Sequence, residues 1–319
     1  MDSQKTVTQP FITVALCTHN HADRLAQTLA DLVHVQHPRQ PWEFLVIDNA
    51  SSDGTPGLLA AMGWRPAGVE IRVVREEKLG LSNARNRALQ EARGDYLLFM
   101  DDDETPDPAW LTAYEQAMLA HQPDALGGRI EVLFEDGARP AWLQDELLGF
   151  LGKLDHGESR WLTESTTPIF GGNFAFRRKV FERIGNFDAR LGRQGTANIG
   201  GEDTEIYRRL LEHNCRVRWV PEAIIQHRIQ TPKLRRSYFL DLHFRQGRME
   251  GARKRGVQSR LPPGYLVRQI LRAYVRALAQ RIRQGSAHSL RLEMNAVYFT
   301  GYVVGWMKDA TDPSSGSAL

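Results

Sequence analysis

The sequence predicts an α/β fold with a mainly parallel sheet. Three observations predict it. Short apolar or β-branched runs are bounded by polar residues, stretches with helical spacing lie between them, and the two kinds alternate through the first third of the chain. The 319 residues are 42% apolar and 25% charged, which is enough for a sizeable core in one large domain or two modest ones.

The first 104 residues are expected to run strand, helix, strand, helix, strand, helix, strand. Strands are predicted at ITVALC (12–17), FLVIDN (44–49), IRVVRE (71–76) and YLLFM (96–100), and helices include HADRLAQTLADLVHV (21–35) and LSNARNRALQEARG (81–94). Leu25, Leu29 and Leu32 give the first helix its apolar face, and Gly94 ends the later one.

From 105 to 227 the pattern is mixed. It begins with a predicted helix at PDPAWLTAYEQAMLA, with proline in its first turn, and a strand at ALGGRIEVLF. An irregular segment follows over 135–170. The region then continues with a strand-to-helix unit at FGGNFAFRRKVFERIG, a helix at GEDTEIYRRLLEHN and an extended piece at VRWVPEAIIQHR. After 228 the chain becomes basic and mostly helical. The final TDPSSGSAL is predicted to be a disordered tail.

Charge is distributed unevenly along the chain. Residues 1–227 hold 24 Lys+Arg and 33 Asp+Glu, a net charge of −9, whereas residues 228–293 hold 16 and 3, a net charge of +13. This asymmetry suggests an anionic partner for the C-terminal segment. Within it, residues 265–283 have the spacing of a basic amphipathic helix, which can lie on an anionic membrane surface.

Other roles for this basic segment stay open. Its helices could instead pack on the rest of the chain or on a second subunit in a homodimer. Nucleic acid is the lesser alternative, because no recognised binding module occurs there. Residues 296–307 are apolar but too short to span a bilayer.

The expected compartment is the cytoplasm, with peripheral attachment to the inner face of the membrane as an alternative. The N-terminal residues lack the basic region, apolar run and cleavage site of a signal peptide. No run reaches the ~18 apolar residues of a spanning helix. Cys17 and Cys215 show no metal-like spacing and are read as two buried thiols.

Polar residues follow three of the predicted strands. They are Thr18-His19-Asn20, Asp48-Asn49 and Asp101-Asp102-Asp103. Ligands of a parallel α/β sheet collect at the carboxyl ends of its strands, so these groups can line one cleft. An Asp-x-Asp there suits Mg²⁺ or Mn²⁺ bound together with substrate phosphates. The alternative is a solvated acidic turn that caps a helix.

Six stretches occur in a fixed order: VALCTHNHADRLAQTL, VIDNASSDGT, GLSNARNRAL, GDYLLFMDDDETPDPAWL, GGNFAFRRKVFERIGNFD and GGEDTEIYRRLLEHNCRVRWVPEAIIQH. Together they resemble the family 2 glycosyltransferases, which have the GT-A fold, a Rossmann-like sheet flanked by helices. The resemblance covers roughly residues 11–227. Each stretch alone is unspecific, whereas six in register are specific.

The resemblance implies an enzyme of the hexosyltransferase type. Such an enzyme moves a sugar, with inversion, from a UDP-, GDP- or dTDP-sugar to a hydroxyl of a glycan or lipid-linked acceptor, in cell-surface or extracellular polysaccharide or glycan synthesis. The residues it implies for the donor nucleotide are Thr18, Asn20, Asp48, Arg85, Asn86 and Asp101. A guanidinium suits phosphate, but Arg85 and Arg87 could also simply solvate a helix face.

The same resemblance implies a metal site of Mg²⁺ or Mn²⁺ at the Asp-x-Asp motif. Asp103 is implied as the direct ligand, Asp101 as a group near the ribose or a metal-bound water, and His227 as the residue that completes the site. The metal would neutralise charge on the leaving diphosphate. A structural role for His227 is the alternative.

For catalysis the resemblance implies a carboxylate as general base. Asp203 is the first choice and Glu202 the second, and Gly200 and Gly201 before them would let the chain approach the ligand. The alternative is that these acids merely favour a helix N-terminus.

The residues GGN at 171–173 resemble the loop that borders donor sugar and acceptor, which makes Gly172 and Asn173 candidate contacts. Trp142 and Trp161 are candidates for stacking on a sugar ring or for burial in a core.

The expected domains are a catalytic domain over 1–230, a basic helical extension over 231–310 and the tail over 311–319. The catalytic domain divides into a nucleotide-binding half (1–104) and an acceptor-binding half (105–230). Two other functions compete with sugar transfer. One is a non-catalytic nucleotide-sugar or glycan-binding protein on the same fold. The other is a sugar nucleotidyltransferase, disfavoured because CTHNHADR stands where its glycine-rich loop would be.

Overall fold

The computed structural model describes residues 12–61, 69–135, 139–192, 201–255 and 264–307. The predicted tail at 311–319 lies outside these residues. The chain forms two compact units. The first, here the α/β unit, contains residues up to 131 and 152–228. The second, here the helical unit, contains 132–151 and the residues from 229 onward.

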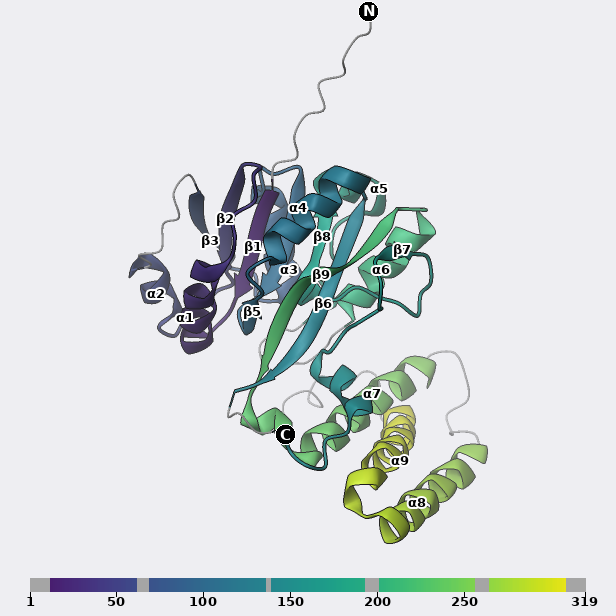
Figure 1. The fold of residues 1–319 in the computed structure, drawn as a ribbon. Helices are drawn as coiled ribbons and strands as arrows, with labels where there is room; N and C mark the ends of the chain where they lie inside the picture. Colours follow the sequence, from purple (N-terminus) through teal and green to yellow (C-terminus); the bar gives the residue numbers. More distant parts are fainter. Residues whose placement is uncertain (1–11, 62–68, 136–138, 193–200, 256–263, 308–319) are drawn as a thin grey trace, which may run out of the picture. The chain divides into compact units, whose positions relative to one another are not determined.

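A nine-stranded sheet is the centre of the α/β unit, in the order β3-β2-β1-β4-β8-β6-β9-β5 with β7 on β9 (Figure 1). The strands are β1 (Ile12–Thr18), β2 (Trp42–Asp48), β3 (Glu70–Arg75), β4 (Tyr96–Asp101), β5 (Glu104–Pro106), β6 (Ala125–Phe134), β7 (Arg160–Leu162), β8 (Phe174–Arg177) and β9 (Val217–Ile229). The parallel strands are β3, β2, β1 and β4, and antiparallel pairing begins at β8.

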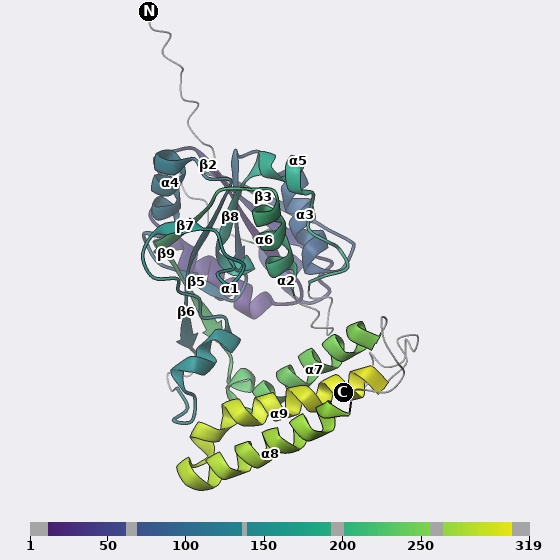
Figure 2. The ribbon, with the colours of Figure 1, turned by 90° about the vertical axis from the view of Figure 1, so that its right-hand side faces the viewer.

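Helices cover both faces of this sheet. They are α1 (Ala22–Asp31), α2 (Thr55–Ala61), α3 (Leu81–Glu91), α4 (Trp110–His121), α5 (Phe181–Ile184) and α6 (Glu202–Glu212). Figures 1 and 2 show α1 and α4 on one face and α3, α5 and α6 on the other. β1, β2 and β4 are almost wholly buried between these layers, which explains their continuous apolar runs.

The strand ends meet at one edge of the sheet, as the sequence predicts. Thr18 of β1 lies opposite Asp48 of β2, and Cys17 lies opposite Asp101 of β4. The parallel register therefore brings together three polar segments that are far apart in the sequence.

The helical unit contains α7 (Arg236–Arg255), α8 (Tyr265–Gln284) and α9 (Ser286–Met307). Its core is one apolar cluster that also includes residues before β7: Leu143, Leu147, Leu148, Leu151, Ile229, Phe239, Leu290 and Met294. The segment 132–151, expected in the acceptor-binding half, belongs to this unit because its leucines pack with α7 and α9.

Four glycines allow α7 and α9 to cross closely. An added Cβ at Gly247 or Gly251 of α7 would lie 2.0 or 1.9 Å from backbone oxygens of α9. At Gly301 or Gly305 of α9 it would lie 2.2 or 1.9 Å from those of α7. Each helix thus has glycines four residues apart on its contact face, an arrangement that lets two backbones touch. None of the helices in the described ranges is long and apolar enough to cross a membrane.

The predicted helices and strands are confirmed, with differences at their ends. The helix after the acidic turn begins at Trp110, so Pro106 and Pro108 precede it rather than occupy its first turn. The first helix ends at Asp31 and continues as a short 3-10 turn, Leu32–His34. The described part of the segment over 135–170 is largely irregular, except for a 3-10 helix at Asp145–Leu151 and the short strand β7.

Candidate active site

The acidic stretch after β4 is a tight turn into β5, and each of its aspartates has a different environment. The Thr18 hydroxyl donates to Asp102 Oδ2 at 2.6 Å, and His21 Nδ1 lies 3.0 Å from the same oxygen. Asp103 Oδ2 lies 3.5 Å from His227 Nε2. The Asp101 side chain is 36% exposed, against 9% for Asp102 and 8% for Asp103. Asp101 is therefore the exposed member of the three, while Asp102 contacts β1 and the start of α1, and Asp103 contacts His227 of β9.

A buried arginine stabilises this turn. Arg228, at the end of β9, pairs with Asp31 of α1 at 2.8 Å and donates to the carbonyl of Glu104 at 3.1 Å. Its backbone N–H donates to the carbonyl of Asp103 at 2.9 Å. The antiparallel pairing of β5 with β9 places His227 opposite Glu104. One strand thus supplies both the histidine beside Asp103 and the arginine that fixes the turn.

Glu104 is a buried carboxyl beneath the turn. Its Oε2 accepts a hydrogen bond from the Asp101 backbone N–H at 2.8 Å. Burial, and then the nearby charge of Asp101, raise the pKa of Glu104 well above its ordinary value. A Cβ added at Gly172 would lie 1.8 Å from Glu104 Oε1, so a larger residue there would displace the Glu104 carboxyl. Gly172 therefore makes room for Glu104.

The centre of the site is a charged cluster around Arg85 of α3. Its guanidinium donates to Asp203 Oδ1 at 2.8 Å and to Glu202 Oε1 at 3.2 Å, and lies 3.7 Å from Asp101 Oδ1. The Arg85 side chain is 2% exposed. Burial works to lower the pKa of Arg85, but the carboxylates of Asp203, Glu202 and Asp101 outweigh it, so the pKa is raised and the group stays charged.

The two acids at the start of α6 differ in access. The Asp203 side chain is 23% exposed, whereas that of Glu202 is 8% exposed. Burial, and then the charge of Asp203, raise the pKa of Glu202. Asp203 is held on both oxygens, because Oδ1 faces Arg85 and Oδ2 accepts from the Gly171 N–H at 2.9 Å. Asp203 is thus the oriented and accessible carboxylate of the pair.

Two aromatic rings lie over Arg85. Its guanidinium carbon is 5.1 Å from the ring centroid of Phe174 and 5.7 Å from that of Phe187. Such contacts are favourable for a desolvated cation. Phe187 lies in the segment that follows α5. The side-chain amide of Asn86 binds its backbone twice: Nδ2 donates to the Phe187 carbonyl and Oδ1 accepts from the Phe187 N–H, at 2.9 Å each.

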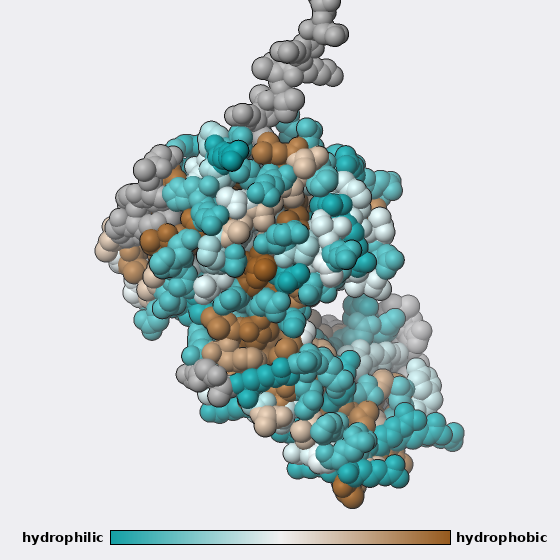
Figure 3. Space-filling view, in the orientation of Figure 1, coloured by the Kyte–Doolittle hydropathy of each residue, from teal (hydrophilic) through white to brown (hydrophobic). Residues whose placement is uncertain are grey.

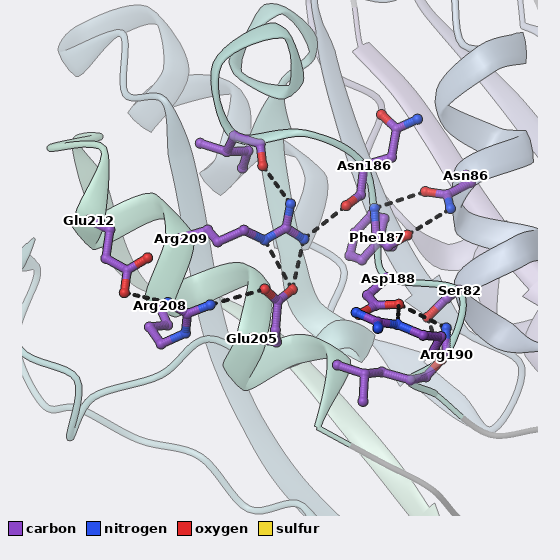
Figure 4. Close-up of polar contacts among 12 residues, drawn as sticks. Ser82, Asn86, Asn186, Phe187, Asp188, Arg190, Glu205, Arg208, Arg209 and Glu212 are labelled. Carbon is purple, nitrogen blue, oxygen red and sulfur yellow. Dashed lines mark hydrogen bonds and ion pairs between the residues drawn. The ribbon is translucent and has the colours of Figure 1, made fainter.

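Figure 4 shows how this segment is fastened between α3 and α6. Ser82 of α3 donates to the carbonyl of Leu191 at 2.7 Å. Arg209 of α6 donates to the carbonyl of Asn186 at 2.8 Å and to Glu205 at 2.7 Å. The helix that begins with Glu202 and Asp203 is therefore tied to the segment that holds Phe187 on Arg85.

The predicted nucleotide contacts at the other strand ends form their own network. Asp48 is 4% exposed. It accepts from Arg75 at 2.9 Å and from the Ser51 N–H at 3.1 Å. Asn20 has φ of 53° and accepts from the Ser52 N–H at 2.7 Å. Thr18 donates to Asp102, as described above. These residues line the edge and fix the loops on either side of it.

Several candidate residues have contacts other than those expected. Asn173 is fully buried, and its amide binds Trp110, Tyr114 and the carbonyls of Arg129 and Ala223. The side-chain amide of Asn173 uses all of its hydrogen-bonding capacity inside the protein. Asn173 therefore has a structural role beneath the site and does not face a ligand. Arg85 and Asn86 likewise bind protein groups, and Arg85 does not solvate a helix face.

The two candidate tryptophans and Gly201 also have defined environments. Trp142 packs edge-on against Phe239 in the helical unit. Trp161 lies under the guanidinium groups of Arg216 and Arg218, at 4.3 and 5.2 Å. Gly201 has φ of 105° and an added Cβ would meet nothing within 4 Å, so glycine is required there by conformation and not by a close approach.

The described side chains can bind a divalent metal only if a ligand completes its coordination shell. Within the described residues, no group of three or more His, Cys, Asp or Glu side chains could hold a metal ion by itself. Asp103 and His227 provide an oxygen and a nitrogen 3.5 Å apart. Mg²⁺ and Mn²⁺ commonly take one or two protein groups and complete their shell with substrate phosphates. The pair therefore fits a metal that arrives with a diphosphate.

Glu104, Arg228 and Phe187 were not assigned a role from the sequence. Glu104 belongs to the acidic run, but only the fold shows that it points under the turn. Arg228 directly follows His227, so its position next to the predicted ligand was the available signal. Phe187 had no sequence signal, because its function depends on Arg85, which is 102 positions earlier in the chain.

A half-parallel sheet with acids at one edge, completed by antiparallel strands, defines a GT-A-like fold. Solved structures confirm this fold. Mannosyltransferase PcManGT from Pyrobaculum calidifontis, in complex with GDP-Man and Mn²⁺, matches with a TM-score of 0.60 and 18% identity over 95% of this chain and 89% of its own. GalNAc-T7 with UDP, GalNAc and Mn²⁺ matches with a TM-score of 0.55 and 19% identity, over 79% of this chain and 52% of its own.

Sequence comparison gives the family. The family described as "Glycosyl transferase family 2" matches residues 13–185, more than half of the chain. A second family, described as "N-terminal domain of galactosyltransferase", matches residues 159–233. The chain belongs to glycosyl transferase family 2.

Two curated relatives illustrate the range of the family. Glycosyltransferase AglE of Haloferax volcanii is 26% identical over 186 residues, 58% of this chain and 59% of AglE. Succinoglycan biosynthesis protein ExoM of Rhizobium meliloti is 26% identical over 243 residues, 75% of this chain and 74% of ExoM. The match spans only 49% to 59% of the length of the first three curated relatives.

Proposed function

We propose that this chain is an inverting glycosyltransferase that moves a sugar from a nucleotide diphosphate to an acceptor hydroxyl, with Asp203 as general base. The observation that carries the proposal is the geometry of Asp203. This carboxylate is accessible and is held by Arg85 and by the Gly171 N–H, within one cluster with Asp101 of the acidic turn.

Asp203 would act on the acceptor. An alcohol is a weak nucleophile, so a carboxylate that accepts its proton during attack speeds the reaction. The acceptor oxygen forms a bond to the anomeric carbon, the bond from that carbon to the diphosphate breaks, and the proton passes to Asp203. Arg85 and the Gly171 N–H would keep the carboxylate in one orientation, so less conformational entropy is lost when the reactive geometry forms.

Asp103 and His227 would hold Mg²⁺ or Mn²⁺ together with the donor diphosphate. When bound, the metal neutralises charge on the leaving nucleotide. Arg228 and Glu104 bind the backbone of the acidic turn, and Asp101 Oδ1 lies 3.7 Å from Arg85 Nη2. The Mn²⁺ in the two solved structures supports this proposal, because both have the same fold.

The names of the relatives and the ligands of the solved structures support the proposed donor and acceptor classes. UDP and GDP-Man are present in the two solved structures, so the donor is proposed to be a nucleotide sugar, with dTDP as a third class to test. ExoM is named for succinoglycan biosynthesis, and another relative is named chondroitin synthase. We therefore place the chain in polysaccharide or glycan synthesis, with a glycan or lipid-linked acceptor.

A thermal-shift screen tests this proposal. UDP-, GDP- and dTDP-sugars are each added with and without Mn²⁺. One nucleotide class is expected to raise the melting temperature in a metal-dependent way, and Asp103→Ala should abolish the metal dependence. If the folded protein responds to no nucleotide, the site assignment is wrong.

Asp203→Asn separates an enzyme from a binding protein. The amide keeps the shape of the side chain but does not accept the acceptor's proton, so transfer should fall by about 10²–10⁴-fold. Donor binding in the thermal-shift assay should persist. Glu212→Gln at the other end of the same helix is the matched control, because Glu212 is exposed and pairs with Arg208, away from Arg85. Equal transfer rates for Asp203→Asn and wild type would exclude Asp203 as the base, whereas donor binding without any transfer by the wild type would favour the non-catalytic binding protein.

A further inference from the structure

Helix α8 has three distinct faces, and only one of them packs against other described residues. Leu266, Ala273 and Ala277 are buried on the face turned to α9. Figures 1 and 2 both show α8 beside α9. The sequence left open whether α8 packs on the protein or binds a partner. Within the described ranges, only Leu266, Ala273 and Ala277 of α8 are buried.

The second face is an apolar stripe in solvent, hereafter the α8 stripe. Its members recur every three or four residues, which places them on one side of the helix. They are Val267 (63% exposed), Leu271 (66%), Tyr274 (44%), Val275 (59%), Leu278 (60%) and Ile282 (77%). Single exposed apolar residues are ordinary, whereas a continuous exposed stripe marks a binding surface. On the visible face, Figure 3 shows hydrophobic residues among hydrophilic ones on the helical unit.

The third face is a row of arginines beside the α8 stripe. Arg268, Arg272 and Arg276 follow one another at intervals of four, and no ion pair with described residues engages them. With residues of α9 that include Asn295 and Phe299, they line a groove of about 450 Å³. Helix α8 contains no Asp or Glu.

We propose that α8 binds the surface of an anionic lipid bilayer, with the α8 stripe in the acyl boundary and the three arginines on lipid phosphates. A helix with an apolar face, a cationic face and low overall hydropathy lies in the plane of a membrane interface. The groove gives the phosphates a recess between α8 and α9. This inference is independent of the proposed sugar transfer.

Charge favours a bilayer over a second copy of the chain. A homodimer through the α8 stripe would bring two helices together that each have five arginines and no acid. The single acid of α9, Glu293, is already paired with Arg236 at 2.9 Å. An anionic surface instead supplies the missing opposite charge, in addition to an apolar layer for the stripe.

The test is co-sedimentation of the full chain with lipid vesicles. One set is phosphatidylcholine alone and the other contains phosphatidylglycerol. Binding to the anionic vesicles is expected and should weaken as salt is raised. The triple variant Arg268→Gln, Arg272→Gln, Arg276→Gln should bind roughly 100-fold more weakly, because each basic group near an anionic surface adds to affinity.

One further variant and two controls separate the contribution of the α8 stripe to vesicle binding from that of the arginines. Leu271→Ser with Leu278→Ser changes only exposed side chains and should reduce binding at least tenfold. Val33→Ser with Leu119→Ser removes exposed apolar groups of the α/β unit, 56% and 42% exposed, and should bind like wild type. The second control is a triple variant that removes the same charge from exposed sites outside α8. It combines Arg93→Gln, Arg208→Gln and Arg253→Gln, and should lose little affinity for the vesicles.

Three results would overturn the proposal. One is no binding of the wild type to anionic vesicles. Another is equal losses in the α8 variants and their controls. The third combines two observations. The wild type is a dimer in sedimentation velocity that the double variant Leu271→Ser, Leu278→Ser dissociates, and the wild type does not bind vesicles. That result would assign the stripe to self-association.

Discussion

Gly171→Ala tests whether the spacing of Arg85 and Asp203 governs the reaction. A Cβ at this position would lie 1.9 Å from Arg85 Nη2 and 2.7 Å from Asp203 Oδ1. The φ of Gly171 is not in the left-handed region, so the methyl group acts through space alone. Ordinary contact begins at about 3.4 Å, so the guanidinium must move by about 1.5 Å or the loop must shift by that much.

The magnitude follows from that displacement. A shift of about 1 Å in a reacting group can reduce the rate by about 100-fold. Overpacking a buried site typically reduces stability by about 1–3 kcal/mol. Gly171→Ala is therefore expected to lower kcat by about 100-fold or more while the chain still folds.

The assay measures initial rates of sugar transfer with the donor identified by thermal shift, together with urea unfolding. Gly57→Ala in α2 is the control, because an added Cβ there meets nothing within 4 Å. It should keep wild-type kcat and gain up to about 1 kcal/mol in stability from helix propensity. A folded Gly171→Ala protein with wild-type kcat would refute the role of the Arg85–Asp203 geometry.

Three further predictions concern stability and reactivity. Gly301→Ala or Gly305→Ala should reduce the free energy of unfolding of the helical unit by about 1–3 kcal/mol, measured in urea, because the new methyl meets the α7 backbone at 2.2 or 1.9 Å; stability at or above wild type would contradict the close crossing. Burial raises the pKa of the Cys17 thiol to about 12, so iodoacetamide at pH 8 should modify Cys17 only after unfolding, and rapid labelling of the native protein would count against it. Burial lowers the pKa of His243 below 6.5, so its neutral form favours the folded state and that stability is lost as the pH falls below 6.5. His243→Phe should flatten the acid limb of the urea midpoint against pH, and an unchanged slope would exclude His243 as its source.

Much of the α/β unit could be predicted from sequence periodicity. β1, β2 and β4 are buried on both faces, so their strands appear as unbroken apolar runs, as in ITVALC and YLLFM. The ends of helices were less predictable. Pro106 and Pro108 suggested an earlier start for α4, but pairing of β5 with β9 keeps Pro106 in a strand.

The site was only partly predictable, because sequence gives the type of a residue and not the direction of its side chain. Asp203 and Glu202 are adjacent and chemically alike, and only burial separates them, at 23% and 8% exposure. Asn173 was expected to face a ligand, but four internal partners bind it. Arg228 was overlooked because its partners are about 120 to 200 positions away in the chain.

By itself, the sequence determined the alternation of strands and helices, the acids at the strand ends and the basic amphipathic character of α8. These features depend on local spacing along the chain, which periodicity records. The tertiary structure decided which carboxylate Arg85 orients, which side chains a Cβ at 171 or 172 would displace, and which face of α8 is left to solvent. Those outcomes depend on contacts between distant segments, since burial and distance between side chains exist only once the chain has packed.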